Sequence, residues 1–169
     1  MSQCTSSQVT THSGDKLPCV TSDRLLPLVG QAAFIGADVI AVDEAQFFPD
    51  LVSNCIIVLT WMLNSRQCIG YIQVDFVTTA AEISHKTVIV AGLDGDFRRK
   101  KFGQLLDVVP LADSVIKVTG KCHLCSRKSI FSFRISADDR QEVVGGGDKY
   151  IPTCRYHYID LSSSHAQHA

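Results

Sequence analysis

The sequence predicts an α/β fold with a parallel sheet, followed along the chain by a small β-rich, metal-binding domain. Two short apolar runs, ADVIAV at 37–42 and KTVIVAGL at 86–93, are rich in β-branched residues, as is typical of strands buried on both faces of a parallel sheet. Such strands need a crossover connection, normally a helix. Beyond residue 118 amphipathic helical patterns stop and paired metal-ligand residues begin, which predicts the second domain.

Length and composition limit the class of protein. A chain of 169 residues that is 46% apolar and 20% charged has the size of one globular domain with a small appendage. A formal net charge of −1 argues against nucleic acid as a partner. The apolar run 55–63 is shorter than the roughly 20 residues of a membrane-spanning helix, so no membrane partner is expected. Seven cysteines behind a polar N-terminal segment favour a reducing, cytoplasmic location.

We expect three parts along the chain. Residues 1–117 are predicted to form a partial α/β domain that begins with about 30 irregular residues. Residues 118–160 are predicted to form short strands and loops around the metal ligands, and residues 161–169 a disordered tail.

Acidic residues follow both predicted strands. Asp43 and Glu44 come directly after the first strand, and Asp94 comes after the second. Open α/β sheets place their ligands at the carboxyl ends of the strands. For the Asp43–Glu44 pair we favour a functional role, whereas for Asp94, which precedes Gly95, a turn or cap role is an equally good interpretation.

The strongest chemical signal is a set of four metal-ligand residues. Cys122-x-x-Cys125 and Cys154-x-x-His157 are separated by residues 126–153, and three thiolates with one imidazole suit a structural, tetrahedral zinc ion. A redox pair or coincidence is disfavoured, because the second ligand pair lies in a segment with too few apolar residues for a core of its own. The other cysteines lack this spacing and are interpreted as ordinary thiols: Cys4, Cys19, Cys55 and Cys68.

Four motifs together resemble one family. They are VIAVDEAQFFPDL, KTVIVAGLDGDFRRKKFG, VVPLADSVIKVTGKCHLC and VVGGGDKYIPTC followed by RYH, and they resemble the zinc-containing cellular-type thymidine kinases. The resemblance covers residues 75–160 nearly continuously, residues 37–51 and, more weakly, residues 11–19. It implies an incomplete P-loop-NTPase-like parallel sheet with a small zinc-binding β-rich domain. It also implies ATP- and Mg²⁺-dependent phosphorylation of the thymidine 5′-hydroxyl, a step of nucleotide salvage for DNA synthesis.

The resemblance also implies roles for single residues. Glu44 matches the general base and Asp43 the strand-end aspartate near magnesium, and the expected ATP–Mg²⁺ set is Asp43, Glu44, Ala45 and Gln46. The expected thymine pocket is formed by Phe47, Leu93, Phe97, Phe102 and Tyr150. Backbone groups that read the thymine edge are expected in the substrate loop at Gln141, Glu142, Val143, Val144 and Gly145. His157 stands where many members have a fourth zinc-binding cysteine, and the family's tetramers imply a homo-oligomer.

One family motif does not occur in these 169 residues. The ATP-binding P-loop, G-x-x-x-x-G-K-[ST], is absent, and the glycine triplet 145–147 is followed by Asp-Lys-Tyr instead. Family members carry the P-loop ahead of the point that matches Met1, so we interpret the sequence as truncated at its N-terminus. We therefore expect weak or no kinase activity from this chain alone.

A second departure is the segment VSNCIIVLTWMLNSRQCIGYIQ at 52–73, where family members continue directly into a helix. When Leu51 is joined to Val74, apolar residues fall at the spacing of a buried helical stripe: Leu51, Phe76, Val77, Ala80 and Ala81. With the segment in place, this stripe is expected to be broken. We interpret residues 52–73 as translated non-coding sequence, such as a retained intron, because a surface insertion is seldom so apolar.

Another class of function competes with the kinase. The chain could be a non-catalytic zinc-binding module, or a partner subunit that binds nucleosides or protein. A basic patch would extend this alternative to nucleic acid, although a solvated surface is the favoured interpretation of its residues: Lys121, Arg127, Lys128 and Arg134.

Overall fold

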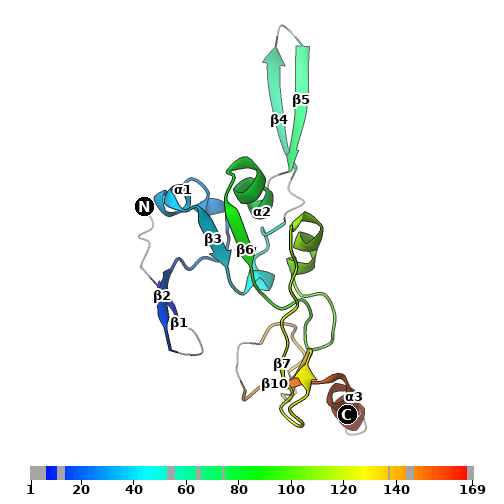
Figure 1. Ribbon diagram of the computed structural model, residues 1–169. Helices are drawn as coiled ribbons and strands as arrows, with labels where there is room; N and C mark the ends of the chain where they lie inside the picture. The colour runs from blue at the N-terminus through cyan, green and yellow to red at the C-terminus, as the bar shows by residue number, and fades with distance from the viewer. Residues whose placement is uncertain are drawn as a thin grey trace. The chain divides into compact units, whose positions relative to one another are not determined.

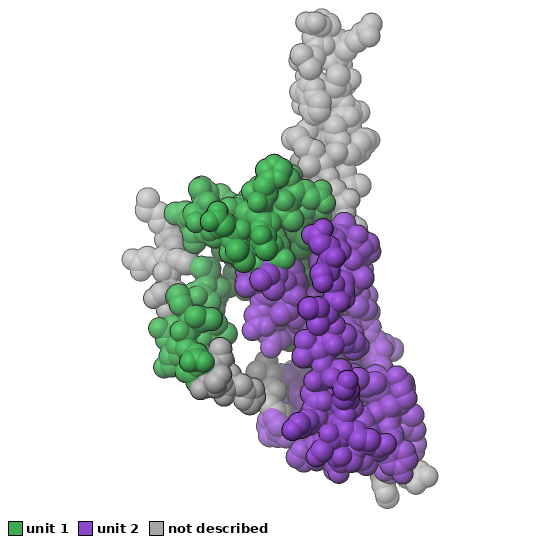
Figure 2. All heavy atoms as spheres, in the orientation of Figure 1, with its two compact units in different colours: residues 1–40, 47–88 green, residues 41–46, 89–169 purple. Residues whose placement is uncertain are grey.

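The computed structural model describes residues 7–10, 14–52, 56–63, 66–73, 75–136, 138–143 and 147–166. The chain divides into two compact units (Figure 2). The first unit comprises residues 1–40 and 47–88, and the second comprises residues 41–46 and 89–169. None of the helices in the described ranges has the length and apolar character needed to cross a membrane.

The chain is a mixture of short helices and strands (Figure 1). It begins with β1 (Ser7–Thr10), β2 (Lys16–Cys19), the 3-10 helix η1 (Leu26–Leu28), α1 (Ala32–Gly36), β3 (Val39–Val42) and the 3-10 helix η2 (Ala45–Phe47). The middle contains β4 (Ile56–Leu63), β5 (Arg66–Gln73), α2 (Phe76–Thr78), the π-helical turn η3 (Thr79–Ile83) and β6 (Thr87–Val90). The last part contains η4 (Leu105–Leu111), β7 (Gly120–Lys121), β8 (Lys128–Ser129), β9 (Phe131–Arg134), β10 (Tyr150–Thr153) and α3 (Arg155–Ala166).

The two strands predicted from the apolar runs are present and paired, as β3 and β6. The Thr87 N–H donates to the Asp38 carbonyl at 3.0 Å, and the Ala91 N–H donates to the Val42 carbonyl at 2.8 Å. Because both partners advance by the same number of residues, the strands are parallel. The predicted burial on both faces is wrong in the described chain, where Val39 and Ile89 are 54% and 55% exposed. The described sheet has only these two strands, so there is little structure to cover both of its faces.

Two backbone hydrogen bonds with helical spacing join the chain on either side of residues 52–73. The Phe76 N–H donates to the Asp50 carbonyl at 3.2 Å, and the Val77 N–H donates to the Leu51 carbonyl at 3.3 Å. When residues 52–73 are left out of the count, both bonds join residues four apart, which is the spacing of an α-helix. Phe76, Leu51 and Val77 are 2%, 0% and 6% exposed, so the predicted buried stripe is formed even with the segment in place.

The hairpin of β4 and β5 explains why the stripe is not broken. The two strands pair antiparallel from Ile56↔Gln73 to Leu63↔Arg66. The hairpin therefore returns the chain close to the turn at Asp50 and Leu51. Asp75 then caps α2 by accepting the Thr78 N–H at 2.7 Å.

The described residues up to position 30, which are 7–10 and 14–30, contain more regular structure than the sequence predicts. β1 and β2 form an antiparallel hairpin, and η1 follows. The buried Asp50 carboxylate accepts the N–H groups of Leu25 and Leu26 at 2.9–3.0 Å. These bonds join Leu25 and Leu26 to a residue 24 or 25 positions later within the first unit. Local sequence patterns do not reveal such a long-range contact.

The second unit is built around the β9–β10 hairpin and α3. The Tyr158 ring packs against Phe131 and Phe133, and its hydroxyl donates to the Phe97 carbonyl at 2.6 Å. α3 extends to Ala166 and so enters the segment 161–169 that was expected to be a disordered tail. Serine hydroxyls in the helix donate to carbonyls one turn earlier, for example Ser162 to Tyr158 at 2.7 Å. These bonds supply a helical role for a serine-rich sequence that otherwise resembles a tail.

Candidate active site and metal centre

The turn after β3 presents the predicted acidic pair to solvent. Asp43 and Glu44 are both exposed, and Glu44 has a backbone φ of +52°. Few non-glycine residues adopt this left-handed conformation, and those that do are often held there at functional sites. The Asp43 carboxylate accepts the Glu44 N–H at 2.9 Å, and the Ala45 N–H donates to the Ala91 carbonyl beyond β6 at 2.9 Å. The turn is thereby fixed to the carboxyl end of the neighbouring strand.

Gln46 holds the Glu44 side chain in place. It is 3% exposed, its Nε2 donates to Glu44 Oε2 at 2.5 Å, and its Oε1 accepts the Leu93 N–H at 2.9 Å. A Cβ at Gly92 would lie 2.4 Å from Gln46 Oε1, and a Cβ at Gly103 would lie 2.0 Å from the Gln46 carbonyl oxygen. Both glycines are therefore needed for this packing. The expected role of Ala45 and Gln46 toward ATP and Mg²⁺ stays a prediction; Ala45 is fully buried.

The residues expected to form the thymine pocket fall into two groups. Leu93, Phe97, Phe102 and Tyr150 belong to the second unit, whereas Phe47 belongs to the first and is 49% exposed. Within the second unit, Phe97 and Tyr150 are brought together on the guanidinium of Arg134, whose carbon lies 3.6 Å and 5.0 Å from the two ring centroids.

The sequence left the role of Asp94 open. In the structure its carboxylate accepts from Lys117 Nζ at 2.5 Å, and its carbonyl accepts the Phe102 N–H at 3.4 Å. Both side chains of this ion pair are about half exposed, with fractions of 58% for Lys117 and 46% for Asp94. These contacts fit the turn interpretation, in which Asp94 shapes the segment after β6.

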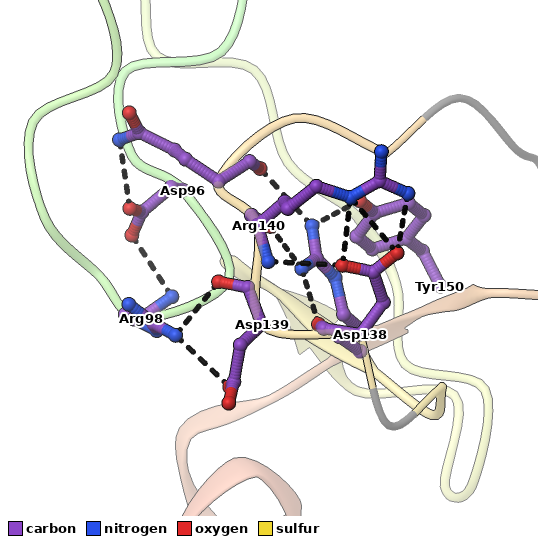
Figure 3. A network of polar contacts seen from close by, with 8 residues as sticks. Asp96, Arg98, Asp138, Asp139, Arg140 and Tyr150 are labelled. Atoms are coloured by element: carbon purple, nitrogen blue, oxygen red, sulfur yellow. Dashed lines mark hydrogen bonds and ion pairs between the residues drawn. The ribbon is translucent and has the colours of Figure 1, made fainter.

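The substrate loop is held at its described residues by the rest of the second unit (Figure 3). Gln141 Nε2 donates to Asp96 Oδ2 at 3.0 Å, and the Val143 carbonyl accepts the Tyr150 hydroxyl at 3.1 Å. Glu142 lies between them, exposed. Two predicted members of the loop, Val144 and Gly145, lie outside the described residues.

The sequence analysis missed the residues that hold this loop. Asp96 lies within the LDGDF motif, but its carboxylate was given no role; it accepts the N–H groups of Arg98 and Lys100 at 2.9 Å and 2.8 Å. Arg134 was interpreted as part of a solvated surface, with a basic patch as the alternative, and both placements on the surface are wrong because Arg134 is 6% exposed. The signal available was its position at the end of an aromatic strand, FSFR, where a charged residue must find buried partners.

The four predicted metal ligands converge on one point. One ligand atom from each of Cys122, Cys125, Cys154 and His157 lies within 4.8 Å of all the others. His157 Nδ1 is 3.4 Å from the sulfurs of Cys122 and Cys154, and the sulfurs of Cys125 and Cys154 are 3.8 Å apart. Zinc–ligand bond lengths in a tetrahedron require about 3.8 Å between sulfurs and about 3.5 Å between sulfur and nitrogen. The cluster could therefore bind a metal ion such as zinc.

Backbone bonds place these ligands. Within the first pair the Cys122 N–H donates to the Arg127 carbonyl at 2.7 Å, and Ser126 turns the chain with a φ of +57°. The His123 N–H donates to the Pro152 carbonyl at 2.8 Å and so joins the first pair to β10, which leads into the second. His157 then follows Cys154 in the first turn of α3.

Electrostatics in the cluster favours the thiolate forms of Cys122 and Cys125, whereas the contact with Cys122 raises the pKa of His157 and favours its protonated form. Burial raises the pKa of Cys122, but N–H groups of Cys154 and Leu124 and the contact with His157 outweigh it, and the pKa falls to about 6. The Arg127 guanidinium, whose Nε donates to Cys125 Sγ at 3.3 Å, lowers the pKa of Cys125. Thiolates are the species that coordinate zinc, so these surroundings prepare the cluster for it.

Comparison with known proteins places the chain in a family. A family model described as thymidine kinase matches residues 66–158. The chain belongs to the thymidine kinase family. The thymidine kinase of Oryza sativa subsp. japonica is 42% identical over 155 residues, which are 90% of this chain and 49% of the relative. The cytosolic thymidine kinase of Homo sapiens is 36% identical, with coverage of 94% and 57%.

The chain covers a larger share of a viral relative. The thymidine kinase of Yaba monkey tumor virus is 35% identical over 90% of this chain and 71% of the relative. Against the plant and human thymidine kinases, the chain spans about half of their length. The Cys/His cluster, whose four ligands were predicted from their spacing, fits the thymidine kinase family.

Proposed function

We propose that this protein is a thymidine kinase that transfers a phosphoryl group from ATP to the 5′-hydroxyl of thymidine, with Glu44 as general base. One observation carries the proposal. Glu44 stands at the carboxyl end of a parallel strand, in a left-handed backbone conformation, with its carboxylate held by the buried Gln46. Ligands bind at such strand ends, and a base needs this kind of fixed position beside the hydroxyl it deprotonates.

The residues divide the chemistry between them. The Glu44 carboxylate accepts the proton of the 5′-hydroxyl as that oxygen attacks the γ-phosphorus of ATP, the bond from this phosphorus to the β,γ-bridging oxygen breaks, and ADP leaves. The exposed Asp43 carboxylate would hold magnesium, which would neutralise phosphate charge when bound. Phe97 and Tyr150 offer ring faces to the thymine base, and the substrate loop offers backbone groups to its edge.

The metal cluster has a structural part in this proposal. Its four protein ligands would fill the coordination sphere of zinc and leave no open position for a substrate. Zinc, when bound, supplies a cross-link between the two ends of residues 126–153, which contain the substrate loop. We further propose that β3 and β6 belong to a larger P-loop-NTPase-like sheet and that residues 118–160 form the zinc domain.

We infer that these 169 residues alone turn over thymidine weakly or not at all. They contain no G-x-x-x-x-G-K-[ST] motif, whose backbone N–H groups and lysine bind the phosphates of ATP. Loss of even one preorganised donor to transition-state charge costs about 10²–10³ in rate. A cytoplasmic location is supported by relatives that are named cytosolic, and a homo-oligomer by the family resemblance alone.

The test is a coupled phosphorylation assay together with calorimetric titration of thymidine on the zinc-loaded chain. We expect saturable thymidine binding, with turnover at least about 10²-fold below that of a full-length relative. Glu44→Gln should abolish the remaining turnover and leave thymidine affinity within about threefold, because a general base acts on the reaction more than on binding. Glu82→Gln, which changes an exposed glutamate in the first unit, is the matched control.

Two results would overturn parts of this proposal. Turnover near that of a full-length relative would contradict the inference of weak activity. A chain that binds zinc but not thymidine would contradict the substrate and favour the alternative, a non-catalytic zinc-binding module.

A further inference from the structure

Arg134 is a buried cation at the base of the substrate loop. It ends β9 and pairs with Tyr150, the first residue of β10, so the loop leaves the hairpin at one partner and returns at the other. The Ile135 N–H donates to the Lys149 carbonyl at 2.9 Å and closes the base. The side chain of Arg134 bonds carbonyl groups of this loop, and the residue is 6% exposed.

Its guanidinium collects acceptors from the loop backbone (Figure 3). Nη1 donates to the Asp138 carbonyl at 2.8 Å and to the Arg140 carbonyl, and Nη2 donates to the Gln141 carbonyl at 3.0 Å and to the Tyr150 hydroxyl. All four terminal N–H groups are therefore used. Tyr150 extends the set by donating to the Val143 carbonyl at 3.1 Å.

The charge of Arg134 is compensated mainly by this loop. Within the described ranges Arg134 forms no ion pair, and its Nε is buried without a hydrogen-bond partner. A buried cation is tolerated only where hydrogen bonds and aromatic faces replace its water, and here those are three carbonyls, one hydroxyl and the ring of Phe97 at 3.6 Å. The loop conformation and the buried charge are therefore mutually dependent.

Other polar contacts of the loop are weaker anchors. Arg98 Nη2 donates to the Asp139 carbonyl at 2.8 Å and to its carboxylate at 3.0 Å, where the Asp139 side chain is 96% exposed. Arg140 bonds the carboxylate of Asp138, and this neighbour holds the pKa of Asp138 well below its usual range. Exposed pairs of this kind contribute little to stability because water competes for both partners.

We propose that Arg134 is a positioning residue that sets the conformation of residues 138–143, which include the described part of the substrate loop. Arg134 thereby determines the affinity of the protein for a pyrimidine nucleoside. By directing the carbonyls of Asp138, Arg140 and Gln141 inward, it fixes the peptide planes that carry the N–H groups of the loop. Lysine is a poor replacement because its three donors spread tetrahedrally and lack the planar fork that serves four acceptors. The nucleoside part of this inference rests on the proposed function.

The experiment compares Arg134→Lys and Arg134→Met with Arg98→Gln, a matched control that removes an exposed arginine contact to the same loop. Zinc content reports whether the second unit stays folded. The rate of tryptic cleavage at the Arg140–Gln141 bond, relative to cleavage after the exposed Arg155, reports loop conformation. Calorimetric titration with thymidine reports affinity.

We expect both Arg134 variants to retain zinc, to cleave at Arg140 at least about tenfold faster, and to bind thymidine at least about tenfold more weakly. Tenfold is the change expected when one charge-assisted hydrogen bond is lost. Arg98→Gln should stay within about threefold of the unchanged chain in both measurements. Arg134→Ala should be rescued by added ethylguanidinium and not by ethylammonium, a result that a loss of overall stability cannot produce.

The two proposals fail in different ways. Wild-type loop cleavage and affinity in a zinc-loaded Arg134→Met chain would overturn the role of Arg134. If the unchanged chain does not bind thymidine, the proposed function fails, and the cleavage rates and their rescue still decide whether Arg134 holds the loop.

Discussion

Two segments of this chain leave the fold and rejoin it between closely spaced points, but they are held in different ways. Residues 52–73 separate the turn at Asp50 and Leu51 from α2, and two hydrogen bonds, Phe76 to Asp50 and Val77 to Leu51, join the chain across the gap. Residues 126–153 leave and return at Cys125 and Cys154, whose sulfurs are 3.8 Å apart. In the first segment the described backbone of β4 pairs with that of β5. In the second segment Gln141 donates a hydrogen bond to Asp96, and Arg134 is buried.

The comparison separates a segment that interrupts a motif from one that completes a site. The sequence already separates them, because residues 52–73 lie outside the family resemblance whereas residues 143–153 belong to one of its motifs. Their bonds show what this means in the structure. Residues 52–73 preserve the structure on either side of them, whereas residues 126–153 supply side chains on which the second unit depends. Removing or loosening each segment should therefore have opposite effects.

The largest effect is expected from the metal ligands that close residues 126–153. Cys154→Ser should abolish stoichiometric zinc binding and melt the second unit, because structural zinc contributes about 10–16 kcal/mol in small zinc modules. Zinc content and thermal unfolding measure this. Cys19→Ser, at a free cysteine of the first unit, should change neither. Full zinc retention by Cys154→Ser would show that the four residues do not act as one site.

The next largest effect on stability is expected in α2, which follows the other segment. Phe76→Ala should lower the free energy of unfolding by about 3–5 kcal/mol, because Phe76 is fully buried beyond the gap. Ile83→Ala, at a residue that is 64% exposed in η3, should change it by less than about 0.5 kcal/mol. Denaturant unfolding followed by circular dichroism separates the two, and equal losses would mean that the buried stripe is not the stabilising feature.

Deleting residues 52–73, so that Leu51 joins Val74, should leave zinc binding unchanged and raise the free energy of unfolding by up to about 3 kcal/mol. The gain comes from the loop-closure entropy that the segment costs. Thermal unfolding measures it, and a chain that unfolds or loses zinc on deletion would show that the hairpin is an integral part of the fold. Sequencing the gene and its transcripts tests the retained-intron interpretation, which fails if the segment lies inside one exon in every transcript.

The smallest effect is expected at the ion pair of Asp138 and Arg140. Arg140 depresses the pKa of Asp138, so this pair contributes stability above the usual pKa of an aspartate, and the contribution is lost as the pH falls through the lowered folded value. Asp138→Asn should remove that part of the acid dependence and change little else. Unfolding curves between about pH 2 and pH 7 give the comparison, with Asp139→Asn as the exposed control.

Much of this architecture could be predicted because it follows from local sequence patterns. The strands β3 and β6, the buried stripe across the gap and the four metal ligands each follow from periodicity or spacing. The register across residues 52–73 was expected to fail with the segment present. It persists because an antiparallel hairpin brings its own ends together, a property of pairing that hydrophobic periodicity does not encode.

The holding residues could not be predicted, because their partners are distant in the chain or are backbone atoms. Asp50 binds Leu25, and Asp96 binds Gln141, across 25 and 45 residues respectively. Arg134 was placed on the surface because charged residues usually lie there. Its acceptors are mostly carbonyl oxygens, which every residue possesses and which no sequence motif marks.

Titration of thymidine into the zinc-loaded chain tests the central claim, that the zinc-tied loop and the Glu44 turn belong to a nucleoside site. We predict saturable binding of one thymidine per chain, lost when zinc is removed by a chelator. A folded chain that carries one zinc and shows no thymidine binding would contradict the account.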